Sequence, residues 1–234
     1  QRNRIAARML PNLPRVTKIL LIANIAGFAL QWMLGEARME VFELWPLVDA
    51  MDDPSGMVSS FMPWQLVTSG FMHGDFWHLF FNMLALVMFG APLEYVWGER
   101  RFTTYYFGCL VGAALCHLVY ATWALQAQST LISAVGASGA VYGFILAYGM
   151  LFPNRRMVFF PIPVTMTART VAILFGALAL FYGVTGSQAG VGHVAHLGGM
   201  LVGWLLIRYW RGQAPFGGRK PKPPSKRPPL RIVR

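Results

Sequence analysis

The chain has 234 residues, of which 56% are hydrophobic and 12% are charged. A soluble domain usually carries about 25% charged residues, so this composition excludes an ordinary soluble fold and indicates a surface that faces lipid. The net charge of +11 would suggest a nucleic-acid partner in a soluble protein, but the distribution of the charges argues against such a partner here.

Apolar segments approach the length of about 20 residues that a helix needs to cross a bilayer. Six are predicted, at Val16–Leu34, Phe76–Trp97, Phe102–Leu125, Leu131–Phe152, Val171–Thr185 and Val191–Trp210. The predicted fold class is all-α, a polytopic membrane protein with six transmembrane helices. We expect a membrane domain over residues 16–210 between a basic tail at 1–15 and a basic, Pro-rich tail at 211–234. The second tail is expected to be disordered and attracted to anionic membrane lipid.

Basic residues set the predicted orientation of these spans. With six spans, 19 of the 20 Lys and Arg residues fall on one side of the membrane and only Arg38 on the other. Cytoplasmic loops carry the excess of Lys and Arg, so both termini are predicted to be cytoplasmic. The basic first ten residues lack the apolar core of a signal peptide. Because no long transit segment is seen, we expect a bacterial inner membrane.

Three connecting segments between the predicted spans are distinctive in sequence. The loop from Gly35 to Asp75 is rich in aromatic residues, which favour the headgroup level of a membrane, so it is expected to lie in the interface. The cytoplasmic segment Pro153–Thr170 is expected to be turn-rich. The short outer segment Gly186–Gly192 contains several glycines and is expected to cover a water-filled cavity.

Four polar side chains lie at one depth in the predicted spans. His78 and Asn82 lie near the start of the second span, Ser138 near the start of the fourth and His196 near the start of the sixth. All three spans run from the outside inward, so the four groups are expected one to two turns below the outer surface. Polar groups inside spans are costly, and they indicate function by default.

Small residues predict which of these spans touch. Two spans each carry a small-xxx-small pair beside the polar residue: Gly139 with Gly143, and Gly199 with Gly203. Such pairs let helix backbones approach closely, so the fourth and sixth spans are expected to meet and bring His196 to Ser138. Tyr142 lies one turn after Ser138 and is expected to stack on the imidazole.

The predicted chemistry is serine-dependent acyl transfer. Ser138 would be the nucleophile, and His196 the general base that later protonates the leaving amine. We find no Asp or Glu in the outer half of the spans, so a dyad is expected in place of the Ser-His-Asp triad. The oxyanion would be stabilised by the Asn82 amide, the His78 ring and the backbone N–H of Ser138 at a helix start.

Other interpretations of these residues are less well supported. The run Gly136-Ala137-Ser138-Gly139 does not match the Gly-x-Ser-x-Gly turn of soluble hydrolases, because residue 140 is Ala. No carboxylate or Cys accompanies the histidines at ligand spacing, so neither a metal nor another cofactor is expected. His73 is expected to hold the first loop, and His193 to be a neighbour of the site. His117 is assigned no role, and Glu94 is expected to be a helix cap or a partner of Arg100 or Arg101.

The ordered motifs resemble the rhomboid family of intramembrane proteases over about residues 16–210. The motifs are Pro63-Trp64-Gln65, the series His73, His78 and Asn82, the run Gly136-Ala137-Ser138-Gly139, and Ala195-His196-Leu197-Gly198-Gly199 with Gly203. The resemblance implies Ser138 and His196 as the dyad and His78 and Asn82 at the oxyanion. Tyr142, Gly136, Gly139 and Gly199 would support them. Gln65 is a departure, because many members have Arg there.

The resemblance also implies a substrate class. It implies single-span membrane proteins, cut near the outer leaflet after a small residue. Two other functions compete with a protease. The first is an inactive relative that binds membrane clients, although such proteins usually lack the Ser or the His. The second is a transporter, which would be expected to show internal repeats and broken helices. No repeat is seen in the sequence, and the oligomeric state stays open.

Overall fold

The structure is a computed structural model that describes residues 13–35, 39–47, 60–128, 131, 133–159, 164–185 and 192–215. Several predicted segments lie outside these residues. They are most of the two tails, the centre of the long loop after the first span, and all of Gly186–Gly192 except its last residue.

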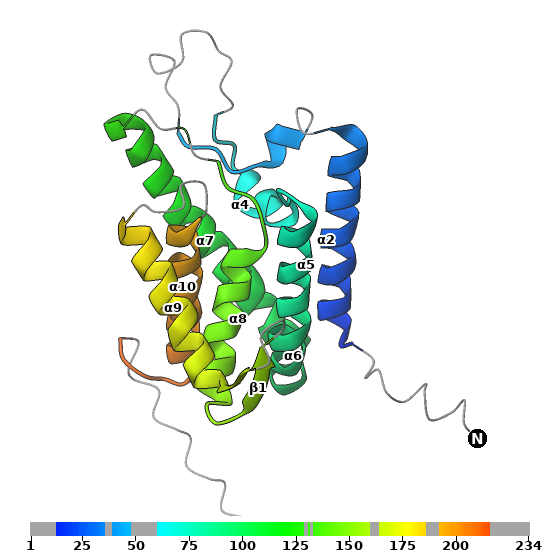
Figure 1. Cartoon of the computed structure of the whole chain (residues 1–234), viewed down its shortest axis with the longest axis vertical. Coiled ribbons are helices and arrows are strands. Elements are labelled where there is room, and N and C mark those ends of the chain that lie inside the picture. Colours follow the sequence, from blue (N-terminus) through cyan, green and yellow to red (C-terminus); the bar gives the residue numbers. More distant parts are fainter. Residues whose placement is uncertain are drawn as a thin grey trace, which may run out of the picture.

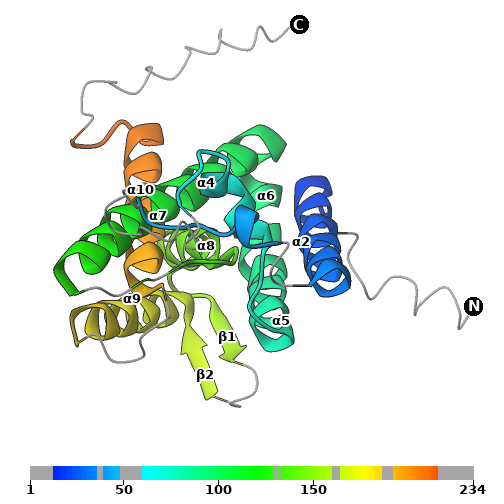
Figure 2. The same ribbon diagram turned by 90° about the horizontal axis from the view of Figure 1, so that it is seen from above.

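The described chain is mostly helical. In chain order the helices are α2 (Arg15–Leu34), η1 (Glu40–Phe42), α4 (Gln65–Thr68), η2 (Ser69–Phe71), α5 (Phe76–Ala85), the π-helix η3 (Leu86–Gly90), α6 (Ala91–Trp97), α7 (Glu99–Gln128), α8 (Ser138–Leu151), α9 (Ala168–Thr185) and α10 (His193–Trp210). The long helices stand side by side as a bundle (Figure 1). Viewed from above, α8 occupies the centre, with α7, α9 and α10 on one side and α5 on the other (Figure 2).

Four helices in the described part are long and apolar enough to cross a membrane: Arg15–Leu34, Phe76–Trp97, Glu99–Ala127 and Ala168–Thr185. They coincide with the first, second, third and fifth predicted spans. Apolar side chains on their outer faces are exposed, among them Trp32 at 84% and Val184 at 78%. This surface is that of a multi-pass membrane protein, because apolar side chains outside a bundle need lipid around them. α8 and α10 are not among the four.

The predicted start of the fourth span at Leu131 is wrong. α8 begins at Ser138 and has only 14 residues. The preceding segment is extended: Ala134 forms a β-bridge with Leu44, and the N–H of Gly136 donates to the Ser69 carbonyl at 2.8 Å. The segment therefore finds its backbone partners in the first loop rather than in a helix. A 14-residue helix rises about 21 Å, which is less than the roughly 30 Å of a hydrocarbon core.

The predicted all-α class needs one correction. The segment expected to be only turn-rich contains an antiparallel pair of strands, β1 (Arg156–Phe159) and β2 (Val164–Thr167). Met157 faces Met166 across this pair, and both pack against the helical core. Alternate residues of a strand point to one face, so both methionines turn toward the helices, where they are partly buried.

Glu94 ties α6 to the start of α2. Its carboxylate is 3% exposed and accepts the N–H of Val16 at 2.9 Å and both the N–H and Oγ1 of Thr17 at 2.7 Å. The first N–H groups of a helix lack partners in the helix and carry a partial positive charge, so this buried carboxylate is well satisfied. Of the two roles predicted for Glu94, a helix cap or a partner of Arg100 or Arg101, the structure shows the cap. The helix that it caps is α2.

Candidate active site

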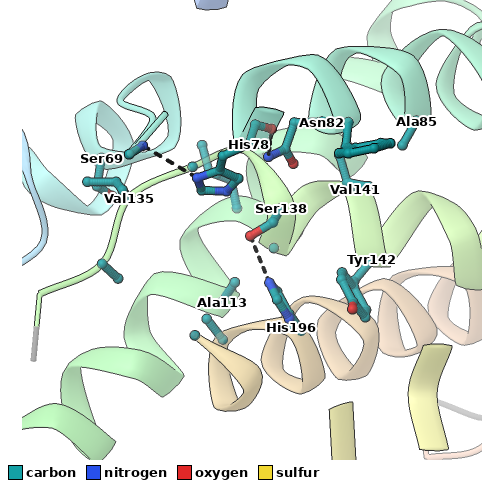
Figure 3. A pocket seen from close by; sticks show the side chains of 18 of the residues that line it. Ser69, His78, Asn82, Ala85, Ala113, Val135, Ser138, Val141, Tyr142 and His196 are labelled. Carbon is teal, nitrogen blue, oxygen red and sulfur yellow. Dashed lines mark hydrogen bonds between the residues drawn. The ribbon is translucent and has the colours of Figure 1, made fainter. Parts of the chain in front are cut away.

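α8 and α10 bring Ser138 and His196 into hydrogen-bond contact. Ser138 Oγ and His196 Nε2 lie 2.8 Å apart, and Figure 3 shows this bond at the centre of the site. Ser138 is the first residue of α8, and His196 lies in the first turn of α10. At this distance a hydroxyl proton can pass directly to a neutral imidazole.

Glycines allow the two helices to approach this closely. A Cβ atom on Gly199 would overlap the carbonyl oxygen of Gly139, and one on Gly143 would lie 3.4 Å from the Gly199 carbonyl oxygen. The backbones of α8 and α10 are therefore in direct contact, as the small-xxx-small pairs predict. A Cβ on Gly139 would in turn overlap the side chain of Ala113 on α7, so three helices converge beside Ser138.

Tyr142 orients the imidazole by stacking. The rings of Tyr142 and His196 are 4.0 Å apart between centroids and only 4° from parallel, which is the contact expected from the one-turn spacing after Ser138. The imidazole is 8% exposed. Within the part of the chain that the structure describes, His196 Nδ1 has no hydrogen-bond partner. Among the described residues, no carboxylate therefore binds Nδ1 as the Asp of a Ser-His-Asp triad would.

His78 lies against the turn that precedes Ser138. Gly136 in that turn has a φ of 113°, and a Cβ there would lie 2.7 Å from Cε1 and Nε2 of His78. Only glycine adopts this φ without strain and leaves room for the ring. His78 Nδ1 accepts a long bond of 3.5 Å from the N–H of Gly74. A neutral imidazole that accepts at Nδ1 carries its proton on Nε2, next to the turn.

Asn82 lies one turn further along α5. Its Nδ2 donates to the His78 carbonyl oxygen at 2.9 Å, and its side chain is 5% exposed. An amide NH₂ has two hydrogens, so one N–H bond is used within the helix and a second is available. Asn82 lines the same cavity as His78, Ser138 and His196.

The first loop holds the turn before Ser138 in place. Gln65 is 1% exposed, and its side-chain oxygen accepts the N–H groups of Trp45 at 3.2 Å and Met62 at 3.1 Å. Ser69 Oγ donates to the Gln65 carbonyl at 2.6 Å, and the Ser69 carbonyl accepts from Gly136. A neutral amide thus organises this loop at the position where the family resemblance leads one to expect Arg.

The other histidines divide into lining and supporting positions. His73 is fully buried, its backbone N–H donates to Gln31 Oε1 at 3.1 Å, and its ring lies 5.1 Å from that of His78. Burial, with a smaller contribution from nearby His78, lowers the pKa of His73 to about 3. His193 stacks on Tyr182 with a centroid distance of 5.1 Å and does not line the cavity around Ser138.

That cavity has a volume of about 880 Å³, and its lining includes a histidine that the sequence interpretation left out. His117 on α7 is 1% exposed and lies four residues after Ala113, which contacts Gly139. Residues four apart share a helix face. The signal that could have found His117 is the small-residue stretch at 112–114, which marks the face of α7 that packs on the site.

Comparison with known proteins points to one family. A family model described as the rhomboid domain matches residues 60–212. The chain is 34% identical over 144 residues to "Rhomboid protein 1, mitochondrial" of Saccharomyces cerevisiae, covering 62% of this chain and 41% of that protein. It is 29% identical over 154 residues to "Rhomboid protease AarA" of Providencia stuartii, covering 61% and 54%. It is 28% identical over 145 residues to "Putative rhomboid protease YdcA" of Bacillus subtilis, covering 61% and 65%.

The chain spans only part of these relatives: 41% of the first, 54% of the second and 65% of the third. The matched region includes every one of the residues that meet at the cavity around Ser138 and His196 except Leu44. Because the rhomboid domain model covers well over half of its 234 residues, the chain belongs to the rhomboid family.

Proposed function

We propose that this chain is an intramembrane serine endopeptidase that cleaves transmembrane segments of single-span membrane proteins near the outer leaflet. The observation that carries the proposal is the 2.8 Å contact between Ser138 Oγ and His196 Nε2, inside a cavity of a multi-pass membrane protein of the rhomboid family. The relatives whose printed names call them rhomboid proteases support the same reaction class.

The first half of the reaction forms an acyl-enzyme. Ser138 Oγ attacks the carbonyl carbon of the scissile peptide bond while His196 Nε2 takes the hydroxyl proton. The tetrahedral intermediate then collapses: its C–N bond breaks, and His196 gives the proton to the departing amine. Tyr142 keeps the imidazole in the plane that both transfers require.

The oxyanion of that intermediate needs donors that are already in place. Ser138 offers its own N–H at the start of α8, His78 offers Nε2–H beside Gly136, and Asn82 offers its second amide hydrogen. Removing one such donor typically costs about 10²- to 10³-fold in rate. The positive end of the α8 dipole adds to their effect.

The second half of the reaction uses water. His196 takes a proton from a water molecule, the resulting hydroxide attacks the acyl carbon, and the ester bond to Ser138 Oγ breaks as His196 returns the proton to that oxygen. The polar end of the cavity, with His117 and Ser133 in its lining, is the part that can hold this water.

We further propose that the chain crosses a bacterial inner membrane six times, with both termini on the cytoplasmic side. α2 begins and α10 ends at the same end of the bundle, and Ser138 lies toward the opposite end (Figure 1). This arrangement supports the even number of spans, with α8 and α10 as the two that are shorter or less apolar. The short α8 would place Ser138 below the outer surface, where water reaches it from outside.

The test is activity-based labelling combined with cleavage. The purified chain is treated with a fluorophosphonate probe and, separately, with a model transmembrane substrate. The wild type should take the label and cut the substrate. Ser138→Ala and His196→Ala should lose cleavage by at least about 10³-fold, because the nucleophile and its base act as a unit.

Thr104→Ala is the control, because it removes an exposed hydroxyl on α7 that bonds only within its own helix and does not line the cavity, and it should keep activity within a few-fold. A wild-type chain that takes no label and cuts no substrate would refute the protease. If it still bound membrane clients, the inactive client-binding relative would replace it.

A further inference from the structure

Below the dyad the cavity continues into a region without polar side chains. Its walls are Ala85, Met88, Phe89, Leu110, Val141 and Ile145, and we call this region the inner chamber. The polar residues of the lining belong to the other end, around Ser138, His78, Asn82 and His196. The two ends therefore suit different parts of a substrate: a peptide group at one end and an apolar side chain at the other.

The inner chamber lies deeper along the same helix faces as the proposed catalytic groups. Ala85 follows Asn82 by three residues on α5, which is about 4.5 Å along a helix axis. Val141 and Ile145 follow Ser138 by three and seven residues on α8, so they share its face. In Figure 3, Asn82, Val141 and Ala85 lie on one side of Ser138, and His196 lies on the opposite side of it.

The backbone changes from α-helix to π-helix beside the inner chamber. The π-helix η3 begins directly after Ala85, and a π-turn, a feature often found at functional sites, holds one more residue than an α-turn. Phe89 forms a fixed wall, because it is 4% exposed and packs edge-on against Tyr148 at 5.4 Å. Met88 is flexible and can adapt to an occupant. Ala85 has the smallest side chain among the walls.

The proposed reaction decides which substrate group faces the chamber. The leaving amine must face His196, which protonates it, and the carbonyl oxygen must face Asn82 and His78. The P1 residue then leaves the carbonyl carbon in the third direction, away from both groups, and the inner chamber beside Ala85 is the apolar part of the lining that can receive its side chain. An apolar chamber there favours an apolar side chain through burial.

We propose that the inner chamber binds the P1 side chain of the substrate, that it selects large apolar residues such as Leu, Met or Phe, and that Ala85 sets its size. The proposal rests on the protease function above. It departs from the small P1 residue that the family resemblance implies, and the reason is specific to the walls of this cavity.

The experiment compares P1 residues in one transmembrane substrate. The full-length chain is given substrates that differ only in Ala, Leu, Met or Phe at P1, and kcat/KM is measured for each. The wild type should cut the three large residues roughly tenfold or more faster than Ala, since differences of this order follow from filling an apolar pocket.

Ala85→Phe and the smaller Ala85→Leu should reverse this preference. Both should lower kcat/KM for large P1 residues by roughly tenfold or more and leave cleavage after Ala within a few-fold. Ala29→Phe is the matched control, because Ala29 is an exposed alanine on α2, away from the cavity lining, and it should retain the wild-type preference. Fluorophosphonate labelling of Ser138 reports that each variant is folded with a working dyad.

Two results would overturn the assignment while the protease itself stands. One is a wild type that cuts after Ala faster than after Leu, Met and Phe. The other is an Ala85 variant that labels normally and slows all four substrates equally. A wild type that neither labels nor cuts any substrate would instead remove the protease, and the P1 assignment with it.

Discussion

At the residue scale, the imidazole of His196 needs an orienting partner other than a carboxylate. In a triad an Asp holds the ring and fixes its tautomer. Here Tyr142 stacks on the ring at 4.0 Å, and Nδ1 has no partner among the described residues. Stacking fixes the plane of the ring but not its tautomer, and the Ser138 hydroxyl can donate to Nε2 only when the ring carries its proton on Nδ1.

Replacing Tyr142 separates stacking from the phenol hydroxyl. Tyr142→Phe keeps the aromatic face and should retain kcat within about threefold, whereas Tyr142→Leu should lower kcat by about tenfold or more, because misplacing a catalytic group by 1 Å can cost about 10²-fold. KM should change little in either variant. Steady-state cleavage of a transmembrane substrate gives both constants, and equal losses in the two variants would show that the hydroxyl is what matters.

His73 makes stability depend on pH. Its pKa in the folded chain is lowered to about 3 by burial, from 6.5, so folding favours the neutral ring. The stabilisation from keeping this ring neutral is complete above pH 6.5 and is lost as the pH falls toward 3, by about 1.4 kcal/mol per pH unit. The difference in thermal stability between wild type and His73→Leu in detergent should narrow across this window, and parallel curves would contradict the assignment.

The sequence identifies the polar residues of the site better than the apolar ones. Ser138, His196, His78 and Asn82 stand out because polar groups inside spans are rare. Ala85, Met88 and Ile145 carry no such signal, since an apolar residue that lines a cavity looks the same in sequence as one that faces lipid. The position of Met88 also depends on the π-helix η3, which apolar periodicity does not reveal.

At the element scale, the glycine contact between α8 and α10 fixes the distance between Ser138 and His196, the proposed nucleophile and base. Gly199→Ala should destabilise the protein by about 2 kcal/mol or more, because its Cβ would overlap the Gly139 carbonyl oxygen and tight packing does not accommodate extra atoms. The separation of the helices should also abolish fluorophosphonate labelling of Ser138.

Gly183→Ala is the control for that substitution. A Cβ on Gly183 of α9 would lie 3.7 Å from the nearest side-chain atom, an ordinary contact, and alanine favours a helix by up to about 1 kcal/mol over glycine. Thermal unfolding should therefore show Gly183→Ala to be neutral or stabilising. Similar destabilisation by both variants would mean that helix contact at Gly199 is not the cause.

Helix positions follow from apolar periodicity, but two local structures do not. The segment before Ser138 is apolar enough to read as helix, yet its backbone pairs with Leu44 and Ser69, residues far away in sequence. The strands β1 and β2 likewise form around Met157 and Met166, which are partly buried against the helical core. Both features depend on long-range contacts that a local pattern does not contain.

At the scale of the whole molecule, charge predicts sidedness. Because 19 of the 20 basic residues fall on one side of the predicted six-span arrangement, a reporter fused after Arg234 should read as cytoplasmic. A cytoplasmic fluorescent protein paired with a periplasmic phosphatase at the same position measures this directly. Phosphatase activity without fluorescence would overturn this topology.

The bundle also shows how one long helix can serve two ends of the protein. α5, η3 and α6 follow one another without a break, and at the α5 end His78 and Asn82 line the cavity. At the other end, Glu94 faces the start of α2. The additional residue of η3 separates these two parts, and deleting it would rotate α6 relative to α5 by about 100°. In an unbroken α-helix the two ends would be out of phase, so that either His78 and Asn82 would point away from the cavity or Glu94 would point away from the start of α2.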